Sequence, residues 1–131
     1  MKFYIASSFR NITAVQTTAN QLKLNGFIQS YDWTENQNVN SLKDLREIGY
    51  LEKNAILNSD IFIIMLPAGK GAHVELGIAL GAMKKIYLYS QTNEMNEIET
   101  TSTFYQLDEV KRIIGTIDEL LKTINAEYKS D

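Results

Sequence analysis

The sequence predicts an α/β domain of three layers, in which a parallel sheet of about five strands lies between helices on both faces. Short apolar runs alternate with segments of helical spacing along the chain, which is typical of strands joined by crossover helices. One run, residues 61–66, is apolar throughout and predicts a buried strand. The length of 131 residues and the apolar content of 44% suit a single domain over residues 1–131.

The first part of the chain is expected to form two strands and a helix. Residues 3–7 are mostly apolar and lead into a polar turn. Residues 12–24 place apolar side chains at helical spacing, and Asn25 and Gly26 favour the end of that helix. A short second strand is expected at residues 27–31, before a polar loop that contains the only tryptophan.

The central part is expected to alternate helix and strand twice. Ser41 is a favourable helix cap, and apolar residues follow it at helical spacing as far as Ile56. The buried strand comes next, and its end is marked by a proline and a glycine-rich turn. A third helix is expected over residues 71–83, and a fourth strand over residues 86–90.

The last part is expected to hold a loop, a strand and a helix. Residues 91–103 are polar and charged, which predicts a loop. Residues 104–107 are expected to form a short fifth strand. The terminal helix is expected over residues 116–128, because Thr116 is a suitable cap and acidic residues follow it in the first turn.

Composition excludes several function classes. A net charge of −3 argues against a nucleic-acid-binding domain, which is normally basic. With no cysteine and one histidine, neither a metal centre nor thiol chemistry is expected, and no cofactor is implied. The first apolar run is too short for a signal peptide, and no apolar stretch approaches the roughly 20 residues that span a membrane. We therefore expect a cytoplasmic protein without a membrane partner.

The turn after the third strand is the most informative segment. Gly69, Lys70 and Gly71 lie between a strand and a helix, where backbone N–H groups and the helix dipole favour an anion. Glu75 follows in or near the first helical turn, so its carboxylate is expected to stay ionised and to serve either as a nucleophile or as a dipole-complementing acid. Neither a dinucleotide fingerprint nor a P-loop is present. Gly77 and its neighbour one turn later are expected to let the helix lie close to the sheet.

Two further acids are candidates for acid–base work. Glu52 shares a helix face with Ile48 and Ala55, so its side chain is expected either at the edge of the core or exposed like most helical glutamates. Asp60 opens the buried strand, where an acid can also simply cap the preceding turn.

Polar and aromatic residues after the first two strands complete the candidate set. Tyr4, Ser8 and Arg10 belong to the first strand and its loop, where a hydroxyl and a guanidinium could bind a phosphate. Ser8 could instead be a helix cap, and Arg10 could be solvated.

Three more side chains lie near the expected site. Asp32 and Trp33 end the second strand, and the indole could stack on a nucleobase or close over the core. His73 could donate a hydrogen bond in the site.

With these residues in place, the chain resembles the nucleoside 2-deoxyribosyltransferase superfamily, which includes the nucleoside 5′-monophosphate N-glycosidases. The resemblance covers most of the chain and rests on four segments, of which the last is the most specific. They are Tyr4-Ile5-Ala6-Ser7-Ser8-Phe9-Arg10, Tyr31-Asp32-Trp33-Thr34, Ser59-Asp60-Ile61-Phe62 and Gly71-Ala72-His73-Val74-Glu75-Leu76-Gly77.

The resemblance implies a flavodoxin-like (Rossmann-like) fold and cleavage of an N-glycosidic bond. Glu75 matches the family glutamate that attacks C1′ and forms a covalent glycosyl-enzyme, from which water or another base takes the sugar with retention. Glu52 matches the acid eight residues before Asp60 that protonates or holds the leaving base, although aspartate is the familiar residue there.

The substrate class within the family depends on one position. Six residues before the nucleophile, free-nucleoside transferases tend to have a carboxylate and monophosphate glycosidases a serine, whereas this chain has Gly69. Ser8 and Arg10 resemble the phosphate-binding residues of the monophosphate glycosidases, and Lys70 adds a cation. The resemblance thus implies a nucleoside or nucleotide substrate, with a slight preference for the phosphorylated one. It also implies a homodimer or higher homo-oligomer.

Two alternatives remain open at this point. A glycohydrolase of NAD or a related dinucleotide would break the same kind of bond with the same glutamate. A nucleotide-binding module without catalysis would keep the pocket and sense its ligand. Hydride transfer has little support because the dinucleotide fingerprint is incomplete.

Overall fold

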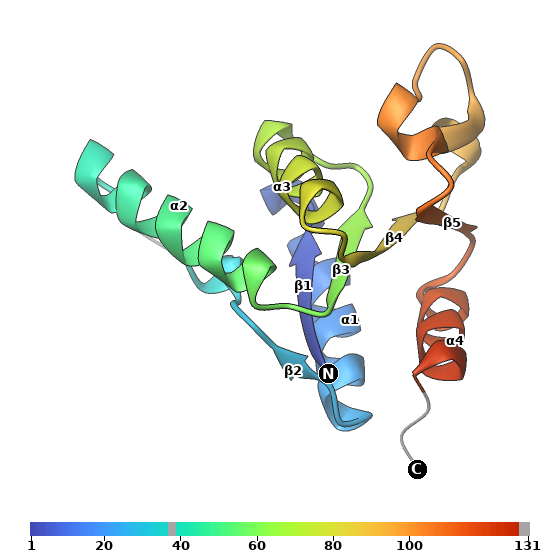
Figure 1. The fold of residues 1–131 in the computed structure, drawn as a ribbon, viewed down its shortest axis with the longest axis horizontal. Helices are drawn as coiled ribbons and strands as arrows, with labels where there is room; N and C mark the ends of the chain where they lie inside the picture. Colours follow the sequence, from blue (N-terminus) through green and yellow to red (C-terminus); the bar gives the residue numbers. More distant parts are fainter. Residues whose placement is uncertain (37–38, 129–131) are drawn as a thin grey trace.

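A computed structural model describes residues 1–36 and 39–128 of the chain (Figure 1). Its sheet has five strands in the order β2-β1-β3-β4-β5, and every neighbouring pair is parallel. The strands are β1 (Lys2–Ala6), β2 (Ile28–Gln29), β3 (Ile61–Met65), β4 (Lys85–Ser90) and β5 (Val110–Ile114). The predicted α/β fold with a parallel sheet is therefore confirmed.

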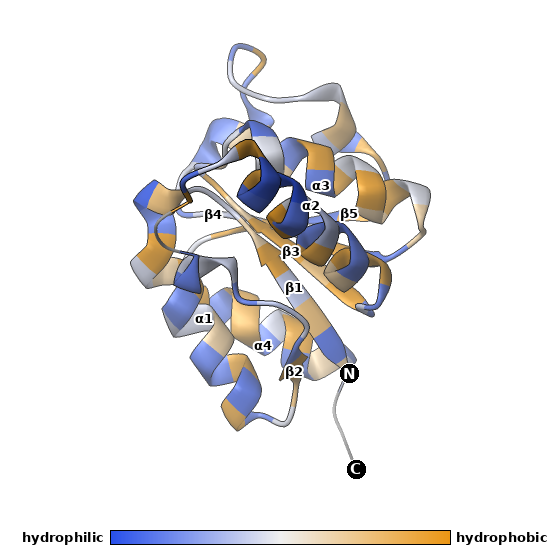
Figure 2. Cartoon of the chain, turned by 90° about the vertical axis from the view of Figure 1, so that its left-hand side faces the viewer, coloured by the Kyte–Doolittle hydropathy of each residue, from blue (hydrophilic) through white to orange (hydrophobic). Residues whose placement is uncertain are grey.

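Four helices cover the two faces of the sheet. They are α1 (Ile12–Leu24), α2 (Leu42–Leu57), α3 (Lys70–Gly81) and α4 (Ile117–Glu127). Helices α1 and α4 contact each other on one face, and α2 and α3 contact each other on the other, with the sheet between the two pairs (Figure 2). Four single 3₁₀ turns lie in the connections: η1 (Phe9–Asn11), η2 (Trp33–Glu35), η3 (Asn93–Asn96) and η4 (Thr103–Gln106).

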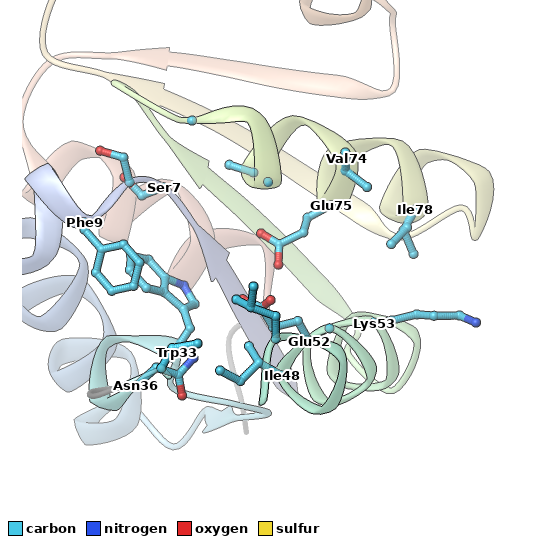
Figure 3. A pocket seen from close by; sticks show the side chains of 17 residues that line it. Ser7, Phe9, Trp33, Asn36, Ile48, Glu52, Lys53, Val74, Glu75 and Ile78 are labelled. Atoms are coloured by element: carbon cyan, nitrogen blue, oxygen red, sulfur yellow. The ribbon is translucent and has the colours of Figure 1, made fainter. Parts of the chain in front are cut away.

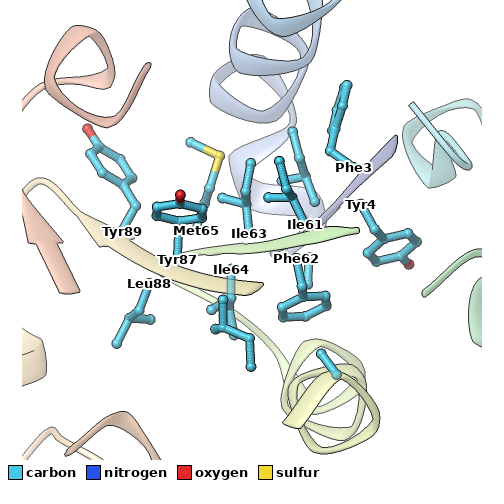
Figure 4. Close-up of a cluster of buried hydrophobic side chains, with 14 of the residues drawn as sticks. Phe3, Tyr4, Ile61, Phe62, Ile63, Ile64, Met65, Tyr87, Leu88 and Tyr89 are labelled. Carbon is cyan, nitrogen blue, oxygen red and sulfur yellow. The ribbon is translucent and has the colours of Figure 1, made fainter. Parts of the chain in front are cut away.

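Strand β3 forms the centre of the core. All five of its side chains are buried, because helices lie over both faces of the strand. Phe62 and Ile64 point toward α3, whereas Ile61 and Ile63 point toward α1 (Figure 4). Alternate side chains of the neighbouring β1 follow the same rule, so Tyr4 lies on the α2–α3 face beside Phe62.

The helix starts agree with the sequence. The Ser41 hydroxyl accepts a hydrogen bond from the Asp44 N–H at 3.1 Å, and the Thr116 hydroxyl accepts one from the Glu119 N–H at 3.2 Å. Each cap satisfies one of the N–H groups that a helix start leaves without a partner. Among the described residues, no helix is long and apolar enough to cross a membrane.

The fifth strand was expected in the wrong place. Residues 104–107 overlap the 3₁₀ turn η4, in which the Ser102 hydroxyl accepts a hydrogen bond from the Phe104 N–H. The strand is Val110–Ile114 instead, which pairs with β4 over its whole length. Lys111 and Arg112 interrupt the apolar run, so the pattern of apolar residues did not indicate this strand. An edge strand tolerates these charges, because its outward side chains reach solvent and nearby acceptors.

The polar segment after β4 also contains more structure than expected. It was predicted as a loop, but it forms the turn η3, and the Met95 side chain is fully buried. The carbonyl of Met95 accepts hydrogen bonds from the side chains of Thr101 and Gln106. This segment therefore packs against the carboxyl end of the sheet.

Gly77 does not have the packing role expected from its spacing. It is exposed, and a Cβ placed on Gly77 or Gly81 would meet nothing within 4 Å. We therefore expect Gly77→Ala to stabilise the protein by about 1 kcal/mol, the helix propensity difference. Urea denaturation monitored by circular dichroism measures the change. The control is Gly26→Ala, which should destabilise because Gly26 has a φ of +93°. A loss of stability in Gly77→Ala would show that this position needs glycine.

Candidate active site

A pocket of about 550 Å³ lies at the carboxyl ends of β1 and β3, on the face that α2 and α3 cover. Parallel sheets bind ligands at this end, where successive connections go to opposite faces. Here the connection after β1 leads to α1 and the connection after β3 leads to α3. The pocket is lined by residues of η1, η2, α2 and the first turns of α3 (Figure 3).

Two carboxyls that line this pocket, those of Glu52 and Glu75, contact one fully buried phenol, that of Tyr4. The Tyr4 hydroxyl, on β1, donates a hydrogen bond to Glu75 Oε2 on α3 at 2.5 Å. The same hydroxyl lies 3.3 Å from Glu52 Oε2 on α2. Figure 3 shows the Glu75 carboxyl pointing from α3 across the pocket toward Glu52. Residues 4, 52 and 75 therefore form one cluster, although they are far apart in the sequence.

The environment of Glu75 changes its ionisation. Burial raises the pKa of its carboxyl to about 7, the hydrogen bond from Tyr4 lowers it, and the nearby Glu52 carboxyl raises it again. Glu75 also lies in the second turn of α3, which begins at Lys70. Burial thus opposes the ionised form that the sequence predicts for this carboxyl. A pKa near neutrality is typical of a residue that exchanges protons or attacks a substrate.

The pKa values of Glu52 and Tyr4, the other two members of the cluster, are also raised. Burial raises the pKa of the Glu52 carboxyl, against the effect of its hydrogen-bonding neighbours. Burial and the two carboxyls raise the pKa of the Tyr4 phenol far above its usual value. Tyr4 therefore stays protonated and acts as a hydrogen-bond donor to the carboxyls.

Aromatic side chains form one wall of the pocket. Trp33 is 6% exposed, and its Nε1–H donates to the carbonyl of Ile5 at 2.5 Å. The Phe9 ring stands edge-on to the indole at 5.3 Å, and it is 62% exposed. Trp33 thus both closes over the core and lines the pocket, whereas Phe9 offers the open aromatic surface.

The opposite wall is the turn that begins α3. Gly69 is the N-cap of the helix, and both Gly69 and Gly71 line the pocket. Ser8 lines it from the other side, where its hydroxyl caps η1 by accepting the Arg10 N–H at 3.2 Å. Ser7 also lines it and donates to the Met65 carbonyl at 2.7 Å, which ties the first loop to the end of β3.

Asp60 lies away from the pocket. Its carboxylate accepts a hydrogen bond from the backbone N–H of Lys2 at 2.9 Å, at the amino end of the sheet. The pocket is at the carboxyl end, so a role for Asp60 at the leaving base is not supported by the geometry. The contact is a structural one, but it joins Asp60 to the neighbouring strand β1 and does not cap the preceding turn, as the alternative interpretation expected.

Five other candidates do not line the pocket either. Tyr4 is fully buried and is connected to the pocket only through its contacts with the two glutamates. Asp32 caps the 3₁₀ turn η2, with its carboxylate accepting from the Thr34 N–H at 3.0 Å. Arg10 and Lys70 are exposed and are absent from the pocket wall. His73 lies on the far side of α3 from the carboxyl pair and contacts η4 instead.

Some pocket residues were not expected from the sequence. Ile48 on α2 and Val74 and Ile78 on α3 form an apolar mouth around the carboxyl pair (Figure 3). Lys53 also lines the pocket, and its side chain extends away from the pair. Their spacing gave a signal, because Ile48 and Ile78 are four and three residues from the two glutamates on their helices.

The expected homo-oligomer stays a prediction.

Comparison with known proteins supports the fold. No protein-family model matches the chain, and no curated protein matches it in sequence. Among solved structures, Clostridium botulinum CMP N-glycosidase BcmB matches with a TM-score of 0.63 and 20% identity, over 95% of this chain and 99% of that one. A conserved protein from Enterococcus faecalis V583 matches with a TM-score of 0.71 and 14% identity, over 98% and 99%.

The first match agrees with the resemblance found in the sequence. BcmB is by its name an N-glycosidase of CMP, a nucleoside 5′-monophosphate. At 20% identity the likeness concerns the arrangement of the chain in space. The chain therefore has the fold of this CMP N-glycosidase along nearly its whole length.

Proposed function

We propose that the protein cleaves the N-glycosidic bond of a nucleoside 5′-monophosphate or nucleoside, with Glu75 as the nucleophile. The observation that carries the proposal is the Tyr4 hydroxyl, which lies within 3.3 Å of one oxygen of each of two half-buried carboxyls that line a pocket. Retaining glycoside cleavage needs two carboxyls with different roles at one site. The shared fold with a CMP N-glycosidase supports the same reaction class.

The first step forms a glycosyl ester. The Glu75 carboxylate attacks C1′, a C1′–O bond forms, and the C1′–N bond breaks with its electron pair leaving on the base. Glu52 gives its proton to the departing base. Water or a second base then attacks C1′ and releases Glu75, while Glu52 takes the proton of the attacking group, so the configuration at C1′ is retained.

The cluster suits this division of roles. Burial raises the pKa of both carboxyls, so the pair can hold one proton between them, and the proposal places that proton on Glu52 when the base leaves. Tyr4 donates its hydrogen bond to Glu75, which favours the ionised form of the nucleophile and fixes the direction of its attacking oxygen.

A phosphorylated substrate is supported by the wall opposite the aromatic side chains. Gly71 and Ala72 in the first turn of α3 line the pocket, and N–H groups in a first turn have no acceptor within the helix. The Ser8 hydroxyl accepts one hydrogen bond and can donate its own hydrogen to a phosphate oxygen. Arg10 and Lys70 lie outside the wall, so they contribute charge near its edge.

A substrate panel tests the proposal. Ribo- and deoxyribonucleosides, their 5′-monophosphates and NAD are incubated with the enzyme, and released base is followed by chromatography. Release from a nucleoside or its monophosphate is expected. Release from NAD alone would favour the dinucleotide alternative. Thermal stabilisation by nucleotides with no base released over hours would favour the non-catalytic module.

Gly69 should determine the preference for phosphate. Its φ of −89° is open to any residue, and an added Cβ would meet nothing within 4 Å. Gly69→Ser should raise the ratio of kcat/KM for the monophosphate over the free nucleoside by about tenfold, through a new hydroxyl donor. Gly69→Asp should lower that ratio by about tenfold, because a carboxylate repels the phosphate.

The two Gly69 variants control for each other. Serine and aspartate are both favourable N-caps, so both should preserve the stability of α3. Equal ratios in the two variants would place the phosphate elsewhere in the pocket.

A further inference from the structure

His73 is held between two partners although it lies outside the pocket. It is the only histidine of the chain, and it stands two residues before Glu75 on α3. Its Nδ1 lies 2.8 Å from the carbonyl oxygen of Gly69, and its Nε2 lies 2.6 Å from the Tyr105 hydroxyl. The two rings stack, with centroids 5.8 Å apart and planes inclined by 26°.

These contacts define the proton positions on the imidazole. A carbonyl oxygen can only accept, so Nδ1 carries the hydrogen that points at Gly69. In a neutral imidazole Nε2 is then an acceptor, and it takes the hydrogen of the Tyr105 hydroxyl. One tautomer satisfies both contacts.

Tyr105 is itself fixed from the other side. Its side chain is 5% exposed, and its backbone carbonyl accepts from Arg112 Nη1 at 2.6 Å. Arg112 belongs to β5, which pairs with β4 in the sheet. A continuous series of hydrogen bonds thus runs from the edge of the sheet through Tyr105 and His73 to Gly69.

The turn at Gly69 needs such support. Gly69 is the N-cap of α3 and has no side chain to cap it, and another glycine lies two residues later. Glycine has more backbone freedom than any other residue, so a helix start with two of them gains order from side-chain contacts made by its neighbours. Within the backbone, the Gly69 carbonyl has a long hydrogen bond of 3.3 Å from the His73 N–H. The imidazole supplies the shorter contact.

We propose that His73 and Tyr105 are positioning residues, which hold the Gly69–Gly71 turn in the conformation that forms one wall of the pocket. Neither side chain touches the substrate. They act through the Gly69 carbonyl, so the 3₁₀ turn η4 is coupled to the pocket on the other side of α3. The effect on substrate rests on the proposed function, whereas the effect on the turn does not.

Kinetics of three variants separate positioning from simple folding. Tyr105→Phe removes one hydroxyl and keeps the ring stack, and we expect KM for the monophosphate to rise about three- to tenfold with little change in kcat. His73→Ala should raise KM at least as much. His73→Asn should restore part of the loss, because its amide N–H can reach the Gly69 carbonyl as Nδ1 does. Equal KM values in all variants would overturn the proposal.

Nuclear magnetic resonance tests the same proposal without activity. Long-range ¹H–¹⁵N spectra of the uniformly labelled protein should show one imidazole, with the hydrogen on Nδ1. Tyr105→Phe should shift the backbone amides of Gly69 and Gly71. The matched control is Tyr87→Phe, which removes a single hydrogen bond to Glu127 on the other face of the sheet.

The outcomes are distinct from failure of the proposed function. A hydrogen on Nε2, or equal amide shifts in Tyr105→Phe and Tyr87→Phe, would overturn the positioning role even in an active enzyme. If no substrate is cleaved, a titration with cytidine 5′-monophosphate gives the Kd in place of KM. Weaker binding in Tyr105→Phe than in Tyr87→Phe would then support the role, and equal binding would overturn it.

Discussion

Glu75→Gln should lower the rate of base release by more than about a thousandfold, because the amide cannot form the glycosyl ester. The fold should survive, and at pH 8 the variant should be more stable than the wild type. The folded-state pKa of Glu75 is raised from 4.5 to about 7, so the stability that its neutral form provides is lost as pH rises through 7. Removing the buried charge should therefore recover on the order of 3 kcal/mol at pH 8 and much less at pH 5.

The measurements are initial rates by chromatography and thermal unfolding at the two pH values. Asp60→Asn is the matched control, since Asp60 lies at the opposite end of the sheet and should leave the rate nearly unchanged. A 2′-deoxy-2′-fluoro substrate should leave a sugar adduct on the peptide that contains Glu75, detected by mass spectrometry. An adduct on another residue would contradict the assignment.

The value of kcat/KM should fall as the pH is lowered through about 7. The midpoint of this fall should move in opposite directions in Tyr4→Phe and Glu52→Gln. The midpoint reports ionisation of Glu75 in the free enzyme. The hydrogen bond from Tyr4 lowers the pKa of Glu75, so Tyr4→Phe should move the midpoint to higher pH. The Glu52 carboxyl raises the same pKa, so Glu52→Gln should move the midpoint to lower pH.

Both variants should also lose rate, by about 10²- to 10⁴-fold for Glu52→Gln if it is the general acid. A base that leaves without protonation should be cleaved at nearly the wild-type rate by Glu52→Gln, which separates the loss of the acid from damage to the pocket. If the midpoint moved in the same direction in both variants, Tyr4 and Glu52 would not have opposite effects on the pKa of Glu75.

The arrangement of the elements could be predicted because periodicity and caps are local signals. The boundaries of α1 and the caps Ser41 and Thr116 agree with the sequence for that reason. The strand Val110–Ile114 could not be found in this way, because Lys111 and Arg112 are placed by partners elsewhere. Lys111 pairs with Glu127 on α4, and Arg112 donates to the Tyr105 carbonyl.

The site was only partly predictable. Glu75, Glu52 and Tyr4 are brought together because helices α2 and α3 lie side by side on the face of β1 that carries Tyr4. The raised pKa values could not be foreseen, because they depend on burial by neighbours from three elements. Asp60 was misplaced because it was matched to the family segment Ser59-Asp60-Ile61-Phe62, although its position at the start of the strand puts it at the end of the sheet opposite the pocket.

Helix α2 has a consequence for how the pocket opens. It has 16 residues, yet only Ala55 and Ile56 are buried, and both lie in its last turn. Its first three turns project from the body of the molecule (Figure 1). Amide hydrogens in such a segment exchange with solvent through local opening, at a lower free energy than those of β3. Glu52 lies between the exposed first turns of α2 and its buried last turn. A ligand bound at Glu52 should therefore slow amide hydrogen exchange in α2 before it slows exchange in the sheet.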